Sequence, residues 1–200
     1  MAKTKNSTEP KAIETIIHPL PPVWNTESRV LLLGTMPSPA SREAGFFYMH
    51  PQNRFWRVLP AVFGETLLYA NNGTPTDAHR APDRNAPNRE AAISERRDFL
   101  LRHRIALWDV LSSCDIHGAA DASIKNAVPN DFCEIFENTK IRRVFCTGKT
   151  AFALWQKHCA ARYKAQFGVT SECLPSTSPA NAQWSVERLI EKYSVIRNYA

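Results

Sequence analysis

The apolar positions of this chain are packed most densely at residues 30–33, where four large aliphatic residues, VLLL, follow one another. A run this short and dense predicts a strand that is buried on both faces. Gly34 ends the run, and Pro37 and Pro39 predict that no helix follows at once. A helix is predicted further on, because large apolar residues recur there at helical spacing. They are Phe55, Trp56, Leu59, Val62 and Phe63.

Apolar runs and helical patterns continue to alternate toward the C-terminus. Further strands are predicted, in chain order, at residues 105–111, 141–146 and 169–174. Helices are predicted around them, at residues 93–103, from 149 onward and at 186–193. Strands that alternate with helices are typical of a parallel α/β sheet, which builds its pocket at the carboxyl ends of its strands. We therefore expect the pocket at the polar and aromatic loop of residues 34–54.

We expect a single domain over residues 1–200, because this length suffices to bury one sizeable core. Residues 1–15 predict a flexible arm. Residues 69–89 are rich in Asn, Pro, Asp and Thr and predict a mobile surface insertion. Residues 112–118, SSCDIHG, predict a polar turn. Residues 121–132 predict a short helix and then a Pro-Asn-Asp turn that caps another helix.

The composition limits where the protein works. Hydrophobic residues make up 44% of the chain, and no apolar run is long enough to span a membrane. The N-terminus has no apolar signal core. The five cysteines are an odd number, and no two are closer than 13 positions. This spacing excludes CxxC pairs and favours reduced thiols in a cytoplasm. We expect a cytoplasmic or otherwise intracellular monomer that does not contact membranes.

The charge indicates a polyanionic partner. The formal net charge is +6, with a sequence pI near 9.2. Residues 140–171 hold seven Lys or Arg residues and no Asp or Glu. If this basic strip includes phosphate contacts, affinity for nucleic acid should fall steeply with salt. The alternative is that the strip is a solvated face.

Several common chemistries lack the residues that they need. The triplet Gly148-Lys149-Thr150 resembles the end of a phosphate loop, but the glycine required five positions earlier is Arg143. The histidines are scattered, with no spacing that supports a metal site, and no serine stands in a GxSxG elbow. We therefore expect no cofactor and no metal, and chemistry that relies on amides, hydroxyls and one or two carboxylates.

A hydroxyl cluster lies in the segment LPSTSPANA, residues 174–182, where three hydroxyl residues stand between two prolines. Such residues let a polyanion approach the backbone and bind phosphate oxygens. Its position between a strand end and a helix start favours this role, although a plain loop is the alternative. The DNA-binding candidates are Ser38, Lys149, Ser176, Thr177, Ser178, Pro179, Ala180 and Asn181, and the last three include the candidate wedge.

Five motifs together resemble the DNA-deoxyinosine (hypoxanthine-DNA) glycosylase family of the uracil-DNA glycosylase superfamily. They are GTMPSP, FFYMHPQNRFW, LWDVLSSC, IKNAVPNDF and LPSTSPANA. The resemblance covers residues 18–193 apart from the insertion. It implies a three-layer α/β/α sandwich with a central four-stranded parallel sheet. It also implies hydrolysis of the N-glycosidic bond of a deaminated base in DNA.

Two departures from the superfamily weigh against efficient uracil excision. Met36 stands where an Asn or acidic residue commonly activates water, and Leu174 stands where a histidine stabilises the uracil oxyanion. The catalytic polar group must then come from elsewhere, and we choose Asn53. Its amide could accept a hydrogen bond from the water or donate one to the leaving base. The alternative role is a cap for the helix that starts at Phe55.

The base must be extruded and held by stacking and edge contacts. The resemblance places a base-reading residue at Asp109, although a shift of one position would substitute Trp108. A carboxylate only accepts hydrogen bonds, so it suits the N1–H of hypoxanthine and repels the N1 of adenine. Asp109 could instead cap a loop or pair with a basic residue, and the aromatic residues could belong to the core. The base-binding candidates are Asp109, Phe46, Phe47, Tyr48, Gly34, Met36 and His50.

The expected protein is a monofunctional glycosylase for DNA containing deaminated bases, hypoxanthine first. No lysine lies in the motifs of the pocket, so Schiff-base lyase chemistry is unsupported. Two rivals remain open. One is a glycosylase for uracil or mismatched thymine. The other is a non-catalytic module that binds damaged DNA.

Overall fold

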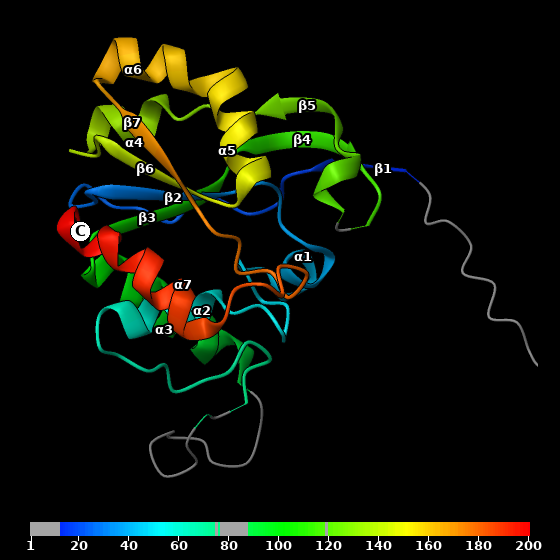
Figure 1. Ribbon diagram of the computed structural model, residues 1–200, viewed down its shortest axis with the longest axis vertical. Helices are drawn as coiled ribbons and strands as arrows, with labels where there is room; N and C mark the ends of the chain where they lie inside the picture. Colours follow the sequence, from blue (N-terminus) through cyan, green and yellow to red (C-terminus); the bar gives the residue numbers. More distant parts are fainter. Residues whose placement is uncertain (1–12, 75, 77–87, 119) are drawn as a thin grey trace, which may run out of the picture.

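The computed structural model describes residues 13–74, 76, 88–118 and 120–200. At its centre is a four-stranded parallel sheet in the order β3-β2-β6-β7. Its strands are β2 (Val30–Gly34), β3 (Ile105–Asp109), β6 (Arg143–Thr147) and β7 (Thr170–Leu174). Helices cover both faces (Figure 1), so the molecule has the predicted α/β/α layers. The predicted central sheet is confirmed.

The helices form two groups on either side of this sheet. One face carries α2 (Phe55–Val62), α3 (Arg89–Arg102) and α7 (Val186–Tyr193), followed by the 3₁₀ segment η3 (Ser194–Asn198). The other face carries α4 (Cys133–Asn138), α5 (Lys149–Trp155), the π-helical segment η2 (Gln156–Ala160) and α6 (Ala161–Phe167). Because side chains alternate along a strand, β2 sends Val30 and Leu32 into one core and Leu31 and Leu33 into the other. The continuous apolar run therefore arises from burial on both faces.

The parallel register brings four strand ends to one edge of the sheet. Gly34 pairs with Asp109, and Thr147 pairs with Leu174. From β2 the chain crosses to β3 on one side and later to β6 on the other, so the strand order reverses beside β2. Open α/β sheets form their ligand crevice at such a reversal. The fold therefore places the loops after β2 and β6 together.

A second sheet, which the sequence did not predict, extends from the first. It is antiparallel, in the order β1-β4-β5, with β1 (Glu14–Ile17), β4 (Leu111–Ile116) and β5 (Lys125–Pro129). The predicted turn at residues 112–118 is thus mostly strand. Cys114 and Ile116 are buried while Ser112, Ser113 and Asp115 are partly exposed, and the register shifts twice. One polar face and these irregularities hide the strand pattern. The short helix predicted from residue 121 is the 3₁₀ turn η1 (Asp121–Ser123).

Two boundaries also differ from prediction. The arm predicted over residues 1–15 ends earlier, since β1 begins at Glu14 and pairs with β4; residues 1–12 lie outside the described residues. The helix α1 (Pro39–Ala44) starts at the proline that was expected to exclude it. Proline is tolerated at the first helical position, where its missing N–H would have no partner. The Ser38 side chain accepts from the Ser41 N–H and caps this helix.

The start of the predicted insertion is part of the packed structure. Tyr69 is buried, and the Glu95 carboxylate of α3 accepts the N–H groups of Leu68 and Tyr69. The Gly73 carbonyl accepts the N–H of Asn88 just before α3. Residues 68–74 therefore pack against α3 and are not the open surface segment that their composition suggested. Residues 75 and 77–87 of the insertion lie outside the described residues.

Candidate active site

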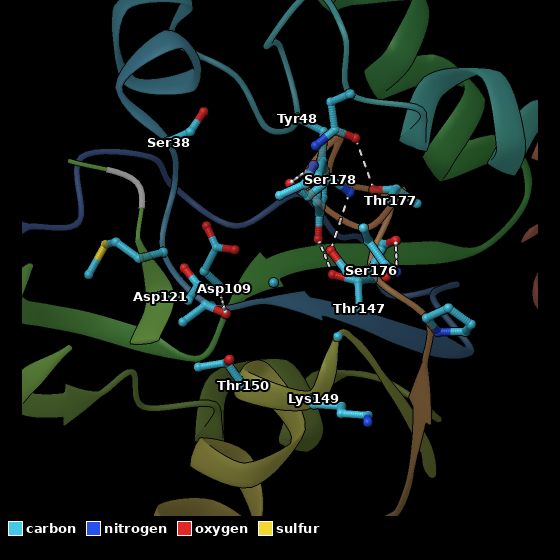
Figure 2. Close-up of a pocket in the computed structure, with 18 of the residues that line it drawn as sticks. Ser38, Tyr48, Asp109, Asp121, Thr147, Lys149, Thr150, Ser176, Thr177 and Ser178 are labelled. Atoms are coloured by element: carbon cyan, nitrogen blue, oxygen red, sulfur yellow. Dashed lines mark hydrogen bonds between the residues drawn. The ribbon is translucent and has the colours of Figure 1, made fainter. Parts of the chain in front are cut away.

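A cavity of about 930 Å³ opens at the carboxyl ends of the parallel strands. The loops after β2, β6 and β7 line it, together with η1. Figure 2 shows Asp109 and Asp121 beside each other, Ser176, Thr177 and Ser178 opposite them, and Lys149 and Thr150 on α5. Its size fits a base with its sugar.

Most residues chosen from the sequence line this cavity. The base-binding and catalytic candidates among the lining residues are Gly34, Met36, Phe47, Tyr48, Asn53 and Asp109. The DNA-binding candidates among them are Ser38, Lys149, Ser176, Thr177, Ser178, Ala180 and Asn181.

Three candidates lie elsewhere. Phe46 is a core residue that packs on the rings of Phe47 and Trp56 and does not line the cavity. The His50 Nδ1 atom accepts the backbone N–H of Gln52, which stabilises a turn outside the lining. Pro179 is exposed beside the cavity.

The Asn53 side chain is held by two hydrogen bonds to its oxygen. Oδ1 accepts the backbone N–H of Phe55 at 2.9 Å and the hydroxyl of Thr177 at 2.9 Å. The first bond gives a partner to the first N–H group of α2, as the alternative role expected, although the N-cap position is Arg54. The second joins the loop after β2 to the loop after β7. Because an amide oxygen has two lone pairs, both are used, and the Nδ2 atom keeps its two N–H groups for another acceptor.

Arg54, which the sequence analysis did not single out, makes more contacts than Asn53 with the loop after β7. We call this loop, which carries Ser176, Thr177 and Ser178, the hydroxyl loop. Its guanidinium donates to the carbonyls of Thr177, Ser178, Asn181 and Trp184. Its backbone N–H donates to the Thr177 carbonyl at 3.2 Å. One side chain thus satisfies four carbonyls of an irregular loop, which would otherwise need water.

Asp109 is almost fully buried, at 3% exposure, and its Oδ2 atom lies 2.9 Å from the His18 Nε2 atom. The Leu20 N–H donates to His18 Nδ1, so Nδ1 is the acceptor and Nε2 carries the proton that Asp109 accepts. A β-carbon on Gly34 would lie only 2.2 Å from the Asp109 Oδ1 atom, which is too close for any side chain. A glycine is therefore required at the end of β2. Trp108 donates its indole N–H to the Leu20 carbonyl and does not line the cavity, which favours Asp109 as the pocket residue.

Tyr48 presents an aromatic ring at the cavity. One face of the ring stacks on Phe55, with centroids 3.9 Å apart and planes at 9°. Its hydroxyl lies 2.6 Å from the Thr147 hydroxyl, which also contacts the Leu33 carbonyl. Burial, and then the nearby Asp109, raise the pKa of Tyr48 well above its usual value. The phenol therefore stays neutral, and only the ring face away from Phe55 is left for a base.

A second carboxylate, Asp121, lines the cavity from η1. Its Oδ2 atom accepts the Thr35 hydroxyl at 2.9 Å. Burial raises the pKa of Asp121, the Thr35 hydrogen bond opposes this, and the charge of Asp109 adds to it. The pocket thus holds two carboxyl groups: Asp121, whose pKa is raised, and Asp109, which accepts from His18.

The hydroxyl loop also forms hydrogen bonds among its own groups. Ser176 Oγ accepts the Ser178 N–H, and Ser178 Oγ accepts the Ala180 N–H. Asn181 donates from Nδ2 to the Ser176 carbonyl. The two serine hydroxyls act as acceptors here, so each can still donate its hydrogen to a phosphate oxygen. Thr177 differs, because it is buried and its hydroxyl donates to Asn53.

Two residues of the basic strip have different surroundings. Arg143 pairs with Glu172 and lies over the rings of Phe145 and Tyr199. Lys149, at the start of α5, lines the cavity. Among the strip residues, Lys149 is thus the one that the fold brings to the site. Lys149 and Lys192 both line the cavity, so the pocket holds lysines although its motifs were expected to contain none.

Within the described residues, no three or more His, Cys, Asp or Glu side chains are grouped so that they could hold a metal ion. In the same part of the chain, no helix has the length and apolar character needed to cross a membrane.

The residues that sequence reasoning missed act through distant partners. His18 and Asp109 are separated by 91 positions, and Thr35 and Asp121 by 86. Arg54 and its carbonyl acceptors are separated by 123 positions or more. Such contacts leave no local spacing pattern. The only available signal was the adjacency of Arg54 to Asn53.

Comparison with known proteins defines the class. The family model of the uracil DNA glycosylase superfamily matches residues 21–195. The chain belongs to this superfamily, and it is a DNA glycosylase.

Individual relatives agree with this assignment. A hypoxanthine DNA glycosylase of Methanosarcina acetivorans is 26% identical over 181 residues, which cover 89% of this chain and 96% of that protein. A hypoxanthine DNA glycosylase of Methanosarcina barkeri is 30% identical over 112 residues, 56% of this chain and 58% of that protein. The solution NMR structure of a candidate uracil DNA glycosylase from M. acetivorans superposes with a TM-score of 0.68. It is 26% identical, and the match covers 92% of this chain and 98% of that one.

The raised pKa of Asp121 predicts a pH-dependent stability change. A carboxyl whose pKa is raised by folding contributes stability below its unfolded value, near pH 3.9, and loses it as pH rises through the folded value. Asp121→Asn should therefore raise the free energy of unfolding at neutral pH, and the gain should shrink on acidification. Urea unfolding of both proteins between about pH 4 and pH 8 measures this.

Asp115→Asn is a control of opposite sign. Hydrogen bonds from Thr15 and Asn126 lower the pKa of Asp115, so its carboxylate contributes stability at neutral pH that is lost on acidification. A pH-independent effect of Asp121→Asn would show that the folded protein does not favour the protonated carboxyl.

Proposed function

We propose that this glycosylase removes hypoxanthine from DNA by hydrolysis of the N-glycosidic bond. The observation that carries the proposal is a buried acceptor, Asp109, in a pocket that also holds Tyr48 and the amide of Asn53. The relatives named hypoxanthine DNA glycosylases support the same substrate. Met36 and Leu174 both line the pocket, so the two departures that disfavour uracil lie where a base would bind.

The proposed recognition uses the fixed orientation of Asp109. Its Oδ2 atom accepts from His18, so Oδ1 is the acceptor left for the base. The N1–H of hypoxanthine is a donor, whereas the N1 of adenine is an acceptor that would face lone pairs. The free face of Tyr48 would stack on the base. This arrangement selects the deaminated purine and rejects its parent.

The proposed chemistry uses the amide nitrogen of Asn53. When the bond from the sugar to the base breaks, the electron pair leaves with the base and positive charge develops on the sugar. Asn53 Nδ2 donates to the base and stabilises its negative charge. Water adds to the sugar and loses a proton, and the released base gains one, so the sum is hydrolysis. Asn53 Oδ1 already holds two donors, which disfavours the alternative that this oxygen binds the water.

We also propose how the protein meets DNA. Lys149 and the hydroxyls of Ser176 and Ser178 would bind phosphates at the cavity mouth, and the exposed Pro179 and Ala180 would fill the space left by the extruded nucleotide. The enzyme would act as a cytoplasmic monomer. Its five cysteines, all among the described residues, are free thiols, which suits a reducing compartment.

The direct test measures single-turnover excision from labelled duplexes that hold hypoxanthine or uracil, followed by alkaline cleavage of abasic sites. The wild-type protein should excise hypoxanthine faster than uracil. Asn53→Ala should lower that rate by about 10²–10³-fold, as loss of an oxyanion donor does. Gln52→Ala, an exposed neighbour outside the cavity lining, is the matched control and should excise normally.

The rival functions give different results in this assay. Faster excision of uracil would assign the alternative glycosylase activity. Tight binding of the damaged duplex without cleavage would indicate a damage-binding module.

Base choice is tested by Asp109→Asn. Since His18 must keep an acceptor, the new amide oxygen should face His18 and the new amide nitrogen should face the base. A donor would then oppose the hypoxanthine N1–H. Excision of hypoxanthine should fall by roughly tenfold or more, because a misplaced charge-assisted hydrogen bond costs on the order of 1.5–3 kcal/mol.

Excision of uracil, if measurable, should fall less or rise, because an amide can both donate to and accept from the edge of a pyrimidine. Asp98→Asn changes an exposed carboxylate on α3 and serves as the control. An equal fractional loss on both bases would mean that Asp109 supports the fold or the water and does not read the base.

A further inference from the structure

Asn71 contacts the back of the loop that carries Asn53. Its Nδ2 atom lies 3.2 Å from the Tyr48 carbonyl, 2.8 Å from the His50 carbonyl and 3.2 Å from the Asn53 carbonyl. The Asn71 amide group therefore contacts three carbonyls of the six-residue loop 48–53. Asn71 belongs to the segment that composition assigned to a mobile insertion.

The orientation of the Asn71 amide is set by a buried cation. Arg96, 1% exposed, donates from Nη2 to Asn71 Oδ1 at 3.1 Å and to the Tyr69 carbonyl at 3.1 Å. Its Nη1 atom donates to the Ala92 carbonyl, and its guanidinium lies 5.3 Å from the Trp56 ring centroid. Since Arg96 only donates, Asn71 must turn its oxygen to Arg96 and its nitrogen to the loop.

Both residues lie outside the main cavity. They line a separate cavity of about 450 Å³, whose lining also includes Asn53. The loop thus separates Asn71 and Arg96 from the place where a base would bind. Any effect that they have on excision must pass through the loop.

The loop has a conformation that needs such support. Tyr48 has a backbone φ of +57°, in the left-handed region that large side chains rarely adopt. Conformations of this kind persist only where the surrounding structure holds them. The Tyr48 carbonyl is one of the three that Asn71 binds, so the strained residue and the proposed catalytic residue share one support.

Burying Arg96 is itself costly. Its Nε atom has no hydrogen-bond partner among the described residues, and burial lowers the pKa of the guanidinium to about 10. An apolar residue would fill the same space without that cost. An apolar residue could not orient Asn71, and this role accounts for the burial of a cation at this position.

We propose that Asn71, oriented by Arg96, is a positioning residue that sets the place of Asn53 relative to the base. This inference rests on the proposed function of Asn53. It makes α3 and the start of the insertion part of the excision machinery, although neither touches the substrate.

The test is Asn71→Asp, which keeps an oxygen for Arg96 but removes the N–H donors to the loop. A displacement of about 1 Å at a reacting group costs roughly 10²-fold in rate, so single-turnover excision of hypoxanthine should fall by roughly 10–100-fold. The Kd for the hypoxanthine duplex should stay within about twofold, because the contacts to phosphates and the stacking face are elsewhere. A loss of this size in rate with Kd unchanged supports positioning.

Asn72→Ala is the matched control, because the Asn72 side chain bonds Thr74 and not the loop. It should leave both the rate and Kd unchanged. In an Asn53→Ala background, which keeps the backbone carbonyl that Asn71 binds, Asn71→Asp should lower the residual rate no further, while its effect on unfolding free energy should persist.

Two failures are distinguishable. If Asn53→Ala abolishes excision but Asn71→Asp excises like wild type, or loses rate and affinity equally, the positioning role is wrong. If Asn53→Ala excises like wild type, the proposed function of Asn53 is wrong, whatever Asn71 does.

Discussion

The site depends on the contact between Arg54 and the loop after β7. Strands β2 and β7 are not neighbours in the sheet, since β6 lies between them. Their loops come together because the Arg54 guanidinium binds four carbonyls of residues 177–184. An irregular loop leaves carbonyls without partners, and the partly buried Arg54 offers five N–H donors in fixed geometry. The pocket wall is therefore built by satisfying backbone groups.

That contact also fixes the chemistry available to Asn53. Because Arg54 holds residue 177 in place, the Thr177 hydroxyl reaches Asn53 Oδ1, while the Phe55 N–H occupies the other lone pair. From behind, Asn71 holds the carbonyl of the same residue. Asn53 is thus held by two hydrogen bonds to its side-chain oxygen and one to its backbone carbonyl, and none of the three uses its amide nitrogen. Preorganisation of this kind is worth most where charge develops during reaction.

The periodicity of apolar residues along the chain was enough to predict its layers of strands and helices. The buried runs at β2 and β6 and the amphipathic helix α7 follow local periodicity, so sequence was enough to predict the parallel sheet. The antiparallel strand β4 was missed because one of its faces is polar, and β5 was missed because none of its residues is buried. The pairing between them is also irregular. The site residues differ in the same way, since some lie in local motifs and others depend on distant contacts. Asn53 and Asp109 were chosen from ordered motifs and line the cavity, whereas His18 and Asp121 contact partners far away in sequence, and no local spacing records them.

The central claim is that the amide nitrogen of Asn53, and not its oxygen, acts on the base. Asn53→Asp separates the two, because a carboxylate keeps acceptors for Phe55 and Thr177 but has no N–H. The account predicts hypoxanthine excision as slow as that of Asn53→Ala. It also predicts an unfolding free energy close to wild type, whereas the alanine variant should lose about 1 kcal/mol with the capping contact. Single-turnover excision at the wild-type rate or above in Asn53→Asp would contradict the claim and assign the water to the oxygen.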